Sequence, residues 1–277
     1  MEIRKIKRNK PRIALILDTW FPVHTGEQVY TAKLAGALAN EHGYEVDILT
    51  RNIEGRSSAE QMEIEGIEGS VRVKKFGWKS HPWNLFLQLA YVLWVFVYLV
   101  WKGKSYRLYH AQSATAAIAM KAAYWFTGVP TLVTVHSSHV FGKRWTLRKI
   151  VHRVMFMETK YAQEISISES FLKAVNVNEH VLVVPYGVNT EPFDAIESRR
   201  SPDQFNVLFV GRLDRQKGVD VLLRAAQKVI DSNGFIQSHK DFMLHLAGEG
   251  PDRPADCQSA IRTRRADRRA NRLCLVW

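Results

Sequence analysis

Short apolar runs alternate with segments of helical periodicity through the first half of this chain, and this alternation limits the fold more than any other feature. Strands that alternate with helices are typical of βαβ units, whose strands run parallel in one sheet. The predicted fold class is therefore α/β. The expected strands are residues 13–17, 45–50, 71–76, 107–112 and 131–136, and the expected helices are residues 28–40 and 114–126.

A second, smaller α/β unit is expected near the end of the chain. Residues 207–210 form an apolar run that predicts a buried strand, and residues 219–230 have the spacing of an amphipathic helix. The polar segment before them, ESRRSPDQ, is the expected linker between domains. The predicted organisation is an N-terminal domain of residues 1–196, a linker of residues 197–204, a second domain that begins with residues 205–250, and a tail of residues 251–277.

The turn between that second strand and helix has the residues of an anion site. Gly211 and Arg212 follow the strand directly, and Lys217 precedes the helix. Arg212 can donate two parallel hydrogen bonds to phosphate oxygens, Lys217 adds a compact charge, and the start of the helix offers unpaired N–H groups. Two solvated loop cations are the alternative interpretation.

The segment FVGRLDRQKGVDVLLRAA resembles the sequence that opens the second domain of retaining GT-B glycosyltransferases of family 4, the group 1 type. The similarity runs from about Arg12 to Pro251. It implies a GT-B-like fold, with a complete N-terminal Rossmann-like lobe on the acceptor side and an incomplete second Rossmann-like lobe. It also implies that Gly211, Arg212 and Lys217 bind the diphosphate of a nucleotide-sugar donor.

The reaction implied by the resemblance is transfer of a sugar, of the hexosyltransferase type, from a nucleotide diphosphate sugar to a hydroxyl of a glycan or lipid-linked acceptor, with retention. Stabilisation of the departing diphosphate would supply most of the barrier reduction. Neither a metal nor a cofactor is expected.

The N-terminal lobe contains further candidates. Gly26 follows the first strand in DTWFPVHTGEQVY, where the family places a pair of glycines against the donor diphosphate or the acceptor. The resemblance therefore makes Gly26 a further candidate for binding the donor diphosphate. His136 and His139 lie in TLVTVHSSH, and the family has a histidine near the transferred sugar at the position of His136. His136 is therefore the catalytic candidate, with a structural histidine as the alternative. His110, in YHAQS, and His139 are acceptor-side candidates.

The tail of residues 251–277 departs from the family pattern, because it is rich in arginine and contains both cysteines, Cys257 and Cys274. We expect truncation or a shifted reading frame there, and a genuine basic tail is the alternative. Catalytic activity of this chain is therefore in question. A noncatalytic fragment that binds an acceptor or docks on a membrane is the alternative function.

The net charge of +12 lies mostly at the ends, because residues 1–12 contribute five charges and residues 251–277 contribute four. This distribution argues against nucleic acid as a partner. With two cysteines and no apolar core in residues 1–12, a cytoplasmic location is expected.

Two segments bear on membranes. Residues 85–101 are apolar over 17 positions, at the lower limit for a bilayer span, and a covering helix is favoured over a spanning or in-plane membrane helix. The segment 143–157, KRWTLRKIVHRVMFM, is basic and amphipathic, so it is either an ordinary surface helix or a contact with anionic lipid. The second interpretation predicts a peripheral location on the inner face of the membrane.

Overall fold

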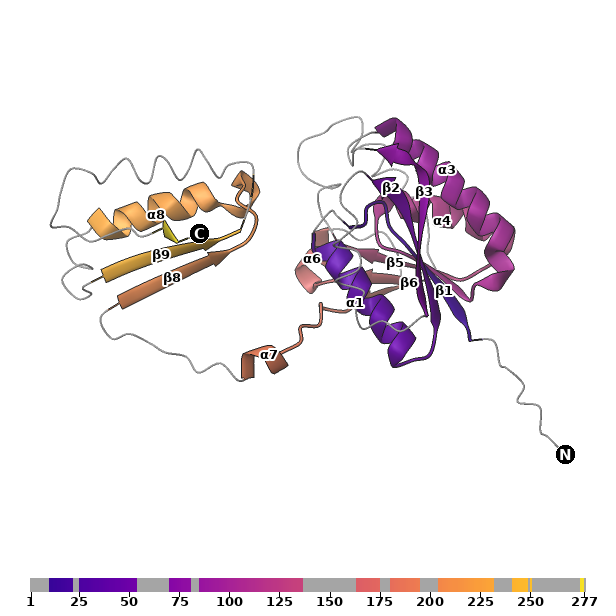
Figure 1. Ribbon diagram of the computed structural model, residues 1–277, viewed down its shortest axis with the longest axis horizontal. Coiled ribbons are helices and arrows are strands. Elements are labelled where there is room, and N and C mark those ends of the chain that lie inside the picture. The colour runs from indigo at the N-terminus through magenta and orange to yellow at the C-terminus, as the bar shows by residue number, and fades with distance from the viewer. Residues whose placement is uncertain are drawn as a thin grey trace. The chain divides into compact units, whose positions relative to one another are not determined.

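The computed structural model describes residues 10–21, 25–53, 70–80, 85–136, 163–174, 180–194, 204–231, 241–248, 250 and 275–276. The chain divides into two compact units, Met1–Val188 and Asn189–Trp277 (Figure 1). The predicted linker falls inside the second unit, and its last residue, Gln204, already belongs to a strand. The basic amphipathic segment of residues 143–157 and the candidate His139 lie outside the described residues.

A parallel sheet of seven strands forms the centre of the first unit, which confirms the predicted fold class. The strand order is β3-β2-β1-β4-β5-β6-β7, and every neighbouring pair runs parallel. The strands are β1 (Arg12–Ile16), β2 (Glu45–Ile53), β3 (Val71–Ser80), β4 (Leu108–Ala111), β5 (Thr131–Val135), β6 (Gln163–Ser166) and β7 (Val181–Val183).

Helices cover both faces of this sheet. Figure 1 shows α1 (Gly26–Asn40) on one side, and α3 (Leu85–Lys102) and α4 (Ala114–Thr127) on the other. Alternate residues of β1 point to opposite faces, as in any strand. Leu15 therefore packs in the cluster of α1, and Ile16 packs in the cluster of α3 and α4. Two shorter elements, the 3-10 turn η1 (Gly103–Ser105) and α6 (Glu169–Ala174), complete this unit among the described residues.

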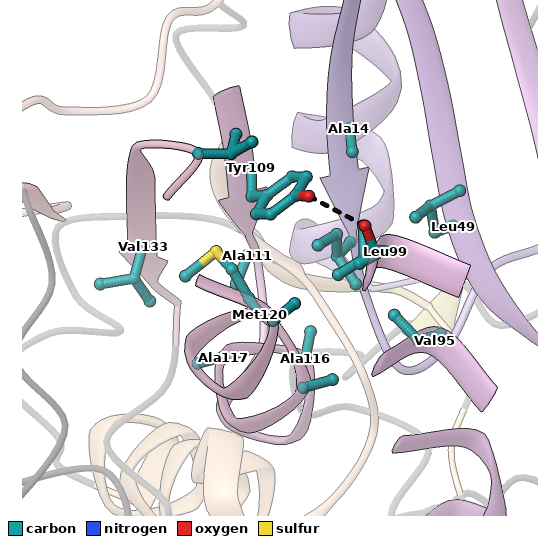
Figure 2. Close-up of a cluster of buried hydrophobic side chains, with 14 of the residues drawn as sticks. Ala14, Leu49, Val95, Leu99, Tyr109, Ala111, Ala116, Ala117, Met120 and Val133 are labelled. Carbon is teal, nitrogen blue, oxygen red and sulfur yellow. Dashed lines mark hydrogen bonds between the residues drawn. The ribbon is translucent and has the colours of Figure 1, made fainter. Parts of the chain in front are cut away.

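The core under α3 and α4 combines small and large side chains (Figure 2). Ala116 and Met120 of α4 are fully buried against the sheet, and so is Leu99 of α3. Tyr109 of β4 donates a hydrogen bond of 3.1 Å from its hydroxyl to the carbonyl oxygen of Leu99. The buried phenol is thus satisfied, which ties the end of α3 to the sheet.

The second unit has a smaller parallel sheet of order β10-β9-β8. Its core pairs Leu244 and Leu246 of the central strand with Ala226 of the covering helix. The last strand comes from the tail of residues 251–277 and pairs with β9. The elements are α7 (Glu191–Asp194), β8 (Gln204–Val210), the 3-10 turn η3 (Arg215–Lys217), α8 (Val219–Asp231), β9 (Asp241–Ala247) and β10 (Leu275–Val276).

Candidate functional site

The topology of the first unit marks one place where a ligand would bind. β1 lies between β2 and β4 in the sheet, and the helices that follow β1 and β4 cover opposite faces. This arrangement is a topological switch point, where the loops after two adjacent strands separate and leave a crevice at their carboxyl ends. The candidates Gly26 and His136 belong to segments that follow β1 and β5 at this edge of the sheet.

The start of α1 is held in place by a glutamine in its first turn. The N–H of Thr25, the N-cap residue, donates to Oε1 of Gln28 at 3.1 Å. Nε2 of Gln28 donates in turn to the carbonyl and hydroxyl oxygens of Thr19, at 3.0 and 2.7 Å. A Cβ atom placed on Gly26 would meet no described atom within 4 Å, so packing does not require a glycine there.

His136 immediately follows β5, and both of its ring nitrogens have partners. Nε2 lies 2.7 Å from Oε1 of Gln112, and Nδ1 is hydrogen-bonded to the hydroxyl of Tyr186. Because an amide oxygen only accepts, Nε2 carries the proton and Nδ1 accepts from the tyrosine. Burial lowers the pKa of His136 to about 4, so the imidazole is neutral at pH 7.

Two tyrosines pack around this histidine. The ring of Tyr30, from α1, lies edge-on to His136 with centroids 5.2 Å apart, and lies 4.8 Å from the ring of Tyr186. Burial raises the pKa of Tyr186 to about 12, with smaller contributions from Tyr30 and Glu27. The phenol therefore keeps its proton over the physiological pH range and donates a hydrogen bond to Nδ1 of His136.

His110 lies within the sheet, one strand away from His136. Its side chain is buried, and its Nε2 atom is 2.8 Å from the hydroxyl oxygen of Thr134. Burial, followed by repulsion from His136, lowers its pKa to about 3. This position favours a supporting role beneath His136, and the predicted contact of His110 with an acceptor stays a prediction.

A pair of carboxylates lies near the start of α1. Burial, followed by the neighbouring charge of Asp18, raises the pKa of Glu27 to about 8. Asp18 accepts a hydrogen bond of 2.6 Å from Nε2 of Gln88 and lies 3.9 Å from Nε of Arg51. Glu27 is therefore protonated at neutral pH and can donate a hydrogen bond.

Our sequence analysis did not nominate five of these side chains: Asp18, Glu27, Tyr30, Gln112 and Tyr186. Four of them, Asp18, Glu27, Tyr30 and Gln112, lie in the motifs DTWFPVHTGEQVY and YHAQS that it did single out. For Asp18 and Gln112 the available signal was a polar residue one or two positions beyond a strand. Tyr186 had no such signal, because its contact with His136 joins positions 50 residues apart.

The second unit has its own cluster at the carboxyl end of β8. Arg212 is 58% exposed, and its Nε atom lies 2.5 Å from Oδ2 of Asp214. Asp214 also caps η3 by accepting from the N–H of Lys217 at 3.1 Å. The sequence predicted a loop that leads directly to the helix, whereas a 3-10 turn and Gly218, with a φ of 72°, precede α8.

Two glycines after β9 let the chain pass close to this cluster. A Cβ atom at Gly248 would clash with the carbonyl oxygen of Gly211, and one at Gly250 would clash with that of Leu213. Gly211 is also bonded to the neighbouring strand, through its N–H and the carbonyl of Ala247 at 2.9 Å. Ala247, Gly248 and Gly250 therefore support the backbone on either side of Arg212.

Residues 25–187 match the Glycosyl transferase 4-like domain, and residues 204–271 match the Glycosyl transferases group 1 domain. The chain belongs to the group 1 glycosyltransferases. The two matches include Gly26, His110, His136, Arg212 and Lys217. The second match also includes residues 251–271, which form most of the tail that the sequence analysis set apart.

Two curated relatives show limited identity. The chain is 27% identical to an uncharacterized glycosyltransferase of Methanocaldococcus jannaschii over 265 residues, which are 86% of this chain and 63% of the relative. It is 25% identical to the GPI3 subunit of phosphatidylinositol N-acetylglucosaminyltransferase from Saccharomyces cerevisiae, over 53% of this chain and 33% of that subunit. The chain thus spans less than two thirds of the length of either relative.

Solved structures show the same fold. Sucrose-phosphate synthase from Thermosynechococcus elongatus superimposes with a TM-score of 0.59 at 19% identity, over 92% of this chain and 66% of the synthase. Anabaena HepE, solved in complex with UDP and glucose, gives 0.62 at 14% identity, over 96% of this chain and 70% of HepE. These similarities confirm the predicted GT-B glycosyltransferase fold.

Proposed function

We propose that this glycosyltransferase transfers a hexose from a nucleotide diphosphate sugar to a hydroxyl of a glycan or lipid-linked acceptor, with retention at the anomeric carbon, in the cytoplasm. The observation that carries the donor assignment is the exposed Arg212 at the carboxyl end of β8, with Lys217 on the short turn before α8. Structures of similar fold were solved with UDP or UDP-glucose bound, which supports a diphosphate at such a site.

The chemistry proposed for Arg212 and Lys217 is stabilisation of charge. As the bond from the sugar to the diphosphate breaks, negative charge grows on the phosphate oxygens. Arg212 would donate two hydrogen bonds to them, and Lys217 would add a second positive charge. Donors of this kind typically contribute about 10²–10³ in kcat. Because Asp214 already pairs with Arg212 and also caps η3, it would hold the guanidinium near the site before the donor binds.

The first unit would contribute a neutral hydrogen-bonding surface. His136 presents an imidazole whose protonated nitrogen is set by Gln112, and it is uncharged at pH 7. Because both nitrogens already have partners, the ring would bond a sugar hydroxyl in exchange for the hydroxyl of Tyr186, and as a neutral imidazole it is a poor proton donor at that pH. We therefore assign His136 to positioning the transferred sugar, and not to acid catalysis.

The first test is calorimetric titration with UDP, GDP and UDP-glucose. We expect Arg212→Ala and Lys217→Ala to weaken binding at least tenfold. Arg224→Ala is the matched control, because Arg224 is a 68% exposed cation on α8 that pairs with Asp220 at 2.9 Å. Equal affinities in all four proteins, or no binding by folded wild-type protein, would contradict the donor site and favour a noncatalytic acceptor-binding fragment.

Turnover is tested separately. The expected result is release of UDP or GDP from a nucleotide sugar in the presence of acceptor, with a product whose anomeric configuration, measured by NMR, equals that of the donor. An inverted product would contradict the proposed stereochemistry and leave the donor site intact.

A further inference from the structure

The outer face of α3 is apolar and exposed along its whole length. Its two ends are the most accessible, since Phe86 is 74% exposed and Trp101 is 73% exposed. Between them the exposed residues recur at helical spacing, three or four positions apart. We call this surface the α3 patch; it consists of Phe86, Leu89, Leu93, Trp94, Val97, Val100 and Trp101.

Aromatic side chains of neighbouring elements enlarge the α3 patch. Trp78 of β3 is 62% exposed, and its ring lies 5.5 Å from that of Trp94. At the other side, Trp125 and Phe126 of α4 are exposed, and Phe126 packs edge-on against Phe96 of α3. An exposed apolar surface of this extent marks an interaction site.

The inner face of α3 is fixed to the sheet. Tyr91, Val95 and Leu99 are fully buried. The hydroxyl of Tyr91 donates to the carbonyl oxygen of Leu17 at 2.8 Å, and Gln88 bonds to Asp18. Residues 86–105 are long and apolar enough to cross a bilayer, but a span would break these contacts with the first unit. The attached helix can instead lie in the plane of a membrane surface.

The charged residues that α3 and η1 place beside the α3 patch are lysines. Residues 85–102 contain no aspartate or glutamate. Lys102, at the end of α3, lies 3.9 Å above the ring of Trp101. Lys102, Lys104 and Phe126 line an open hollow of about 370 Å³ beside that ring. A lysine at the edge of an aromatic surface can reach lipid headgroups while its carbon stem covers the apolar part.

We infer that the α3 patch binds the surface of an anionic lipid bilayer, with α3 parallel to the membrane plane. Tryptophan is enriched at the boundary between headgroups and acyl chains, and the α3 patch and its surround present four: Trp78, Trp94, Trp101 and Trp125. Anionic headgroups complement the lysines, whereas a second copy of this chain would set lysines against lysines. The inference does not depend on sugar transfer, although it would bring the first unit close to a lipid-linked acceptor.

The test is co-sedimentation of the full chain with phosphatidylglycerol–phosphatidylcholine vesicles and with pure phosphatidylcholine vesicles. We expect binding to the anionic vesicles that weakens with salt, and at least tenfold weaker binding to neutral ones. Leu93→Glu/Val97→Glu should reduce anionic binding at least tenfold. Phe193→Glu, which places the same charge at a 64% exposed apolar site on α7, is the control and should bind as wild type.

A second variant, Lys102→Glu/Lys104→Glu, alters only side chains at the rim and keeps the test valid if the first variant fails to fold. Each protein is checked by circular dichroism and by UDP titration without vesicles, so that loss of donor binding is distinguished from loss of lipid binding. Equal vesicle binding by the variants and the control would overturn the inference. So would a wild-type dimer that ignores vesicles and becomes a monomer on substitution in the α3 patch.

Discussion

The Nε2 atom of His136 lies 2.7 Å from Oε1 of Gln112, and this contact decides which nitrogen of the imidazole carries the proton. Gln112 is itself buried, one residue beyond β4. The tautomer and the orientation of the catalytic candidate therefore depend on a side chain next to the neighbouring strand, whereas its neutral state follows from burial. The first prediction follows from this pair.

Two substitutions of Gln112 test its contact with His136. Gln112→Glu places a carboxylate next to Nε2, so the pKa of His136 should rise above its present value of about 4. Gln112→Leu leaves the buried N–H without its acceptor and should cost ~1–3 kcal/mol of stability. NMR titration of the histidine ring and denaturant unfolding measure the two effects. The same His136 pKa in wild type and Gln112→Glu would show that the contact is absent in solution.

Acid should destabilise the fold through His110. Its folded pKa is about 3, below the ordinary value of 6.5, so the unfolded chain binds more protons between these pH values. Stability is then unaffected above pH 6.5 and falls as the pH decreases toward 3, by ~2 kcal/mol at pH 5. His110→Asn should flatten this dependence, whereas His42→Asn, an exposed control, should not. The same loss of stability between pH 7 and pH 5 in wild type and in His110→Asn would refute the assignment.

The opposite dependence is expected from Glu27. Its folded pKa is about 8 against an ordinary 4.5, so the folded protein holds the extra proton between these values and loses stability as the pH rises through them. Glu27→Gln keeps a neutral hydrogen-bonding group and should be more stable than wild type at pH 9, but not at pH 4. The measurement is urea unfolding at both pH values. A variant that is less stable at pH 9 would indicate a charged, paired carboxylate.

The glycines after β9 should be needed for donor binding. Gly248→Ala and Gly250→Ala introduce a Cβ into the backbone of Gly211 and Leu213, so the turn that presents Arg212 has to move. We expect a loss of ~1–3 kcal/mol in stability and weaker UDP binding. Gly187→Ala is the control, because a Cβ there meets no described atom within 4 Å. Unchanged UDP affinity in both variants would show that donor binding at Arg212 does not depend on these two glycines.

The pattern of the sequence was sufficient for the architecture. Alternation of strand and helix predicted the parallel sheet of the first unit, since a strand buried on both faces must be apolar throughout and the crossover between parallel strands needs a helix. The same local logic placed Arg212 at the end of β8, because the residue after a strand is determined by where the strand ends. The strand that residues 275–276 add to the second sheet had no such local signal.

Contacts between distant segments were decided only by the tertiary structure. Tyr186 meets His136 across 50 residues, and Gly248 meets Gly211 because two parallel strands end side by side. The sequence also identified residues 85–101 as apolar without showing which side would be covered. The sheet buries Tyr91, Val95 and Leu99 and leaves Leu93 and Val97 exposed, because a helix on a flat surface can bury only one face. Local pattern thus determined the elements, while burial, protonation and the exposed surface depended on which elements the fold brought together.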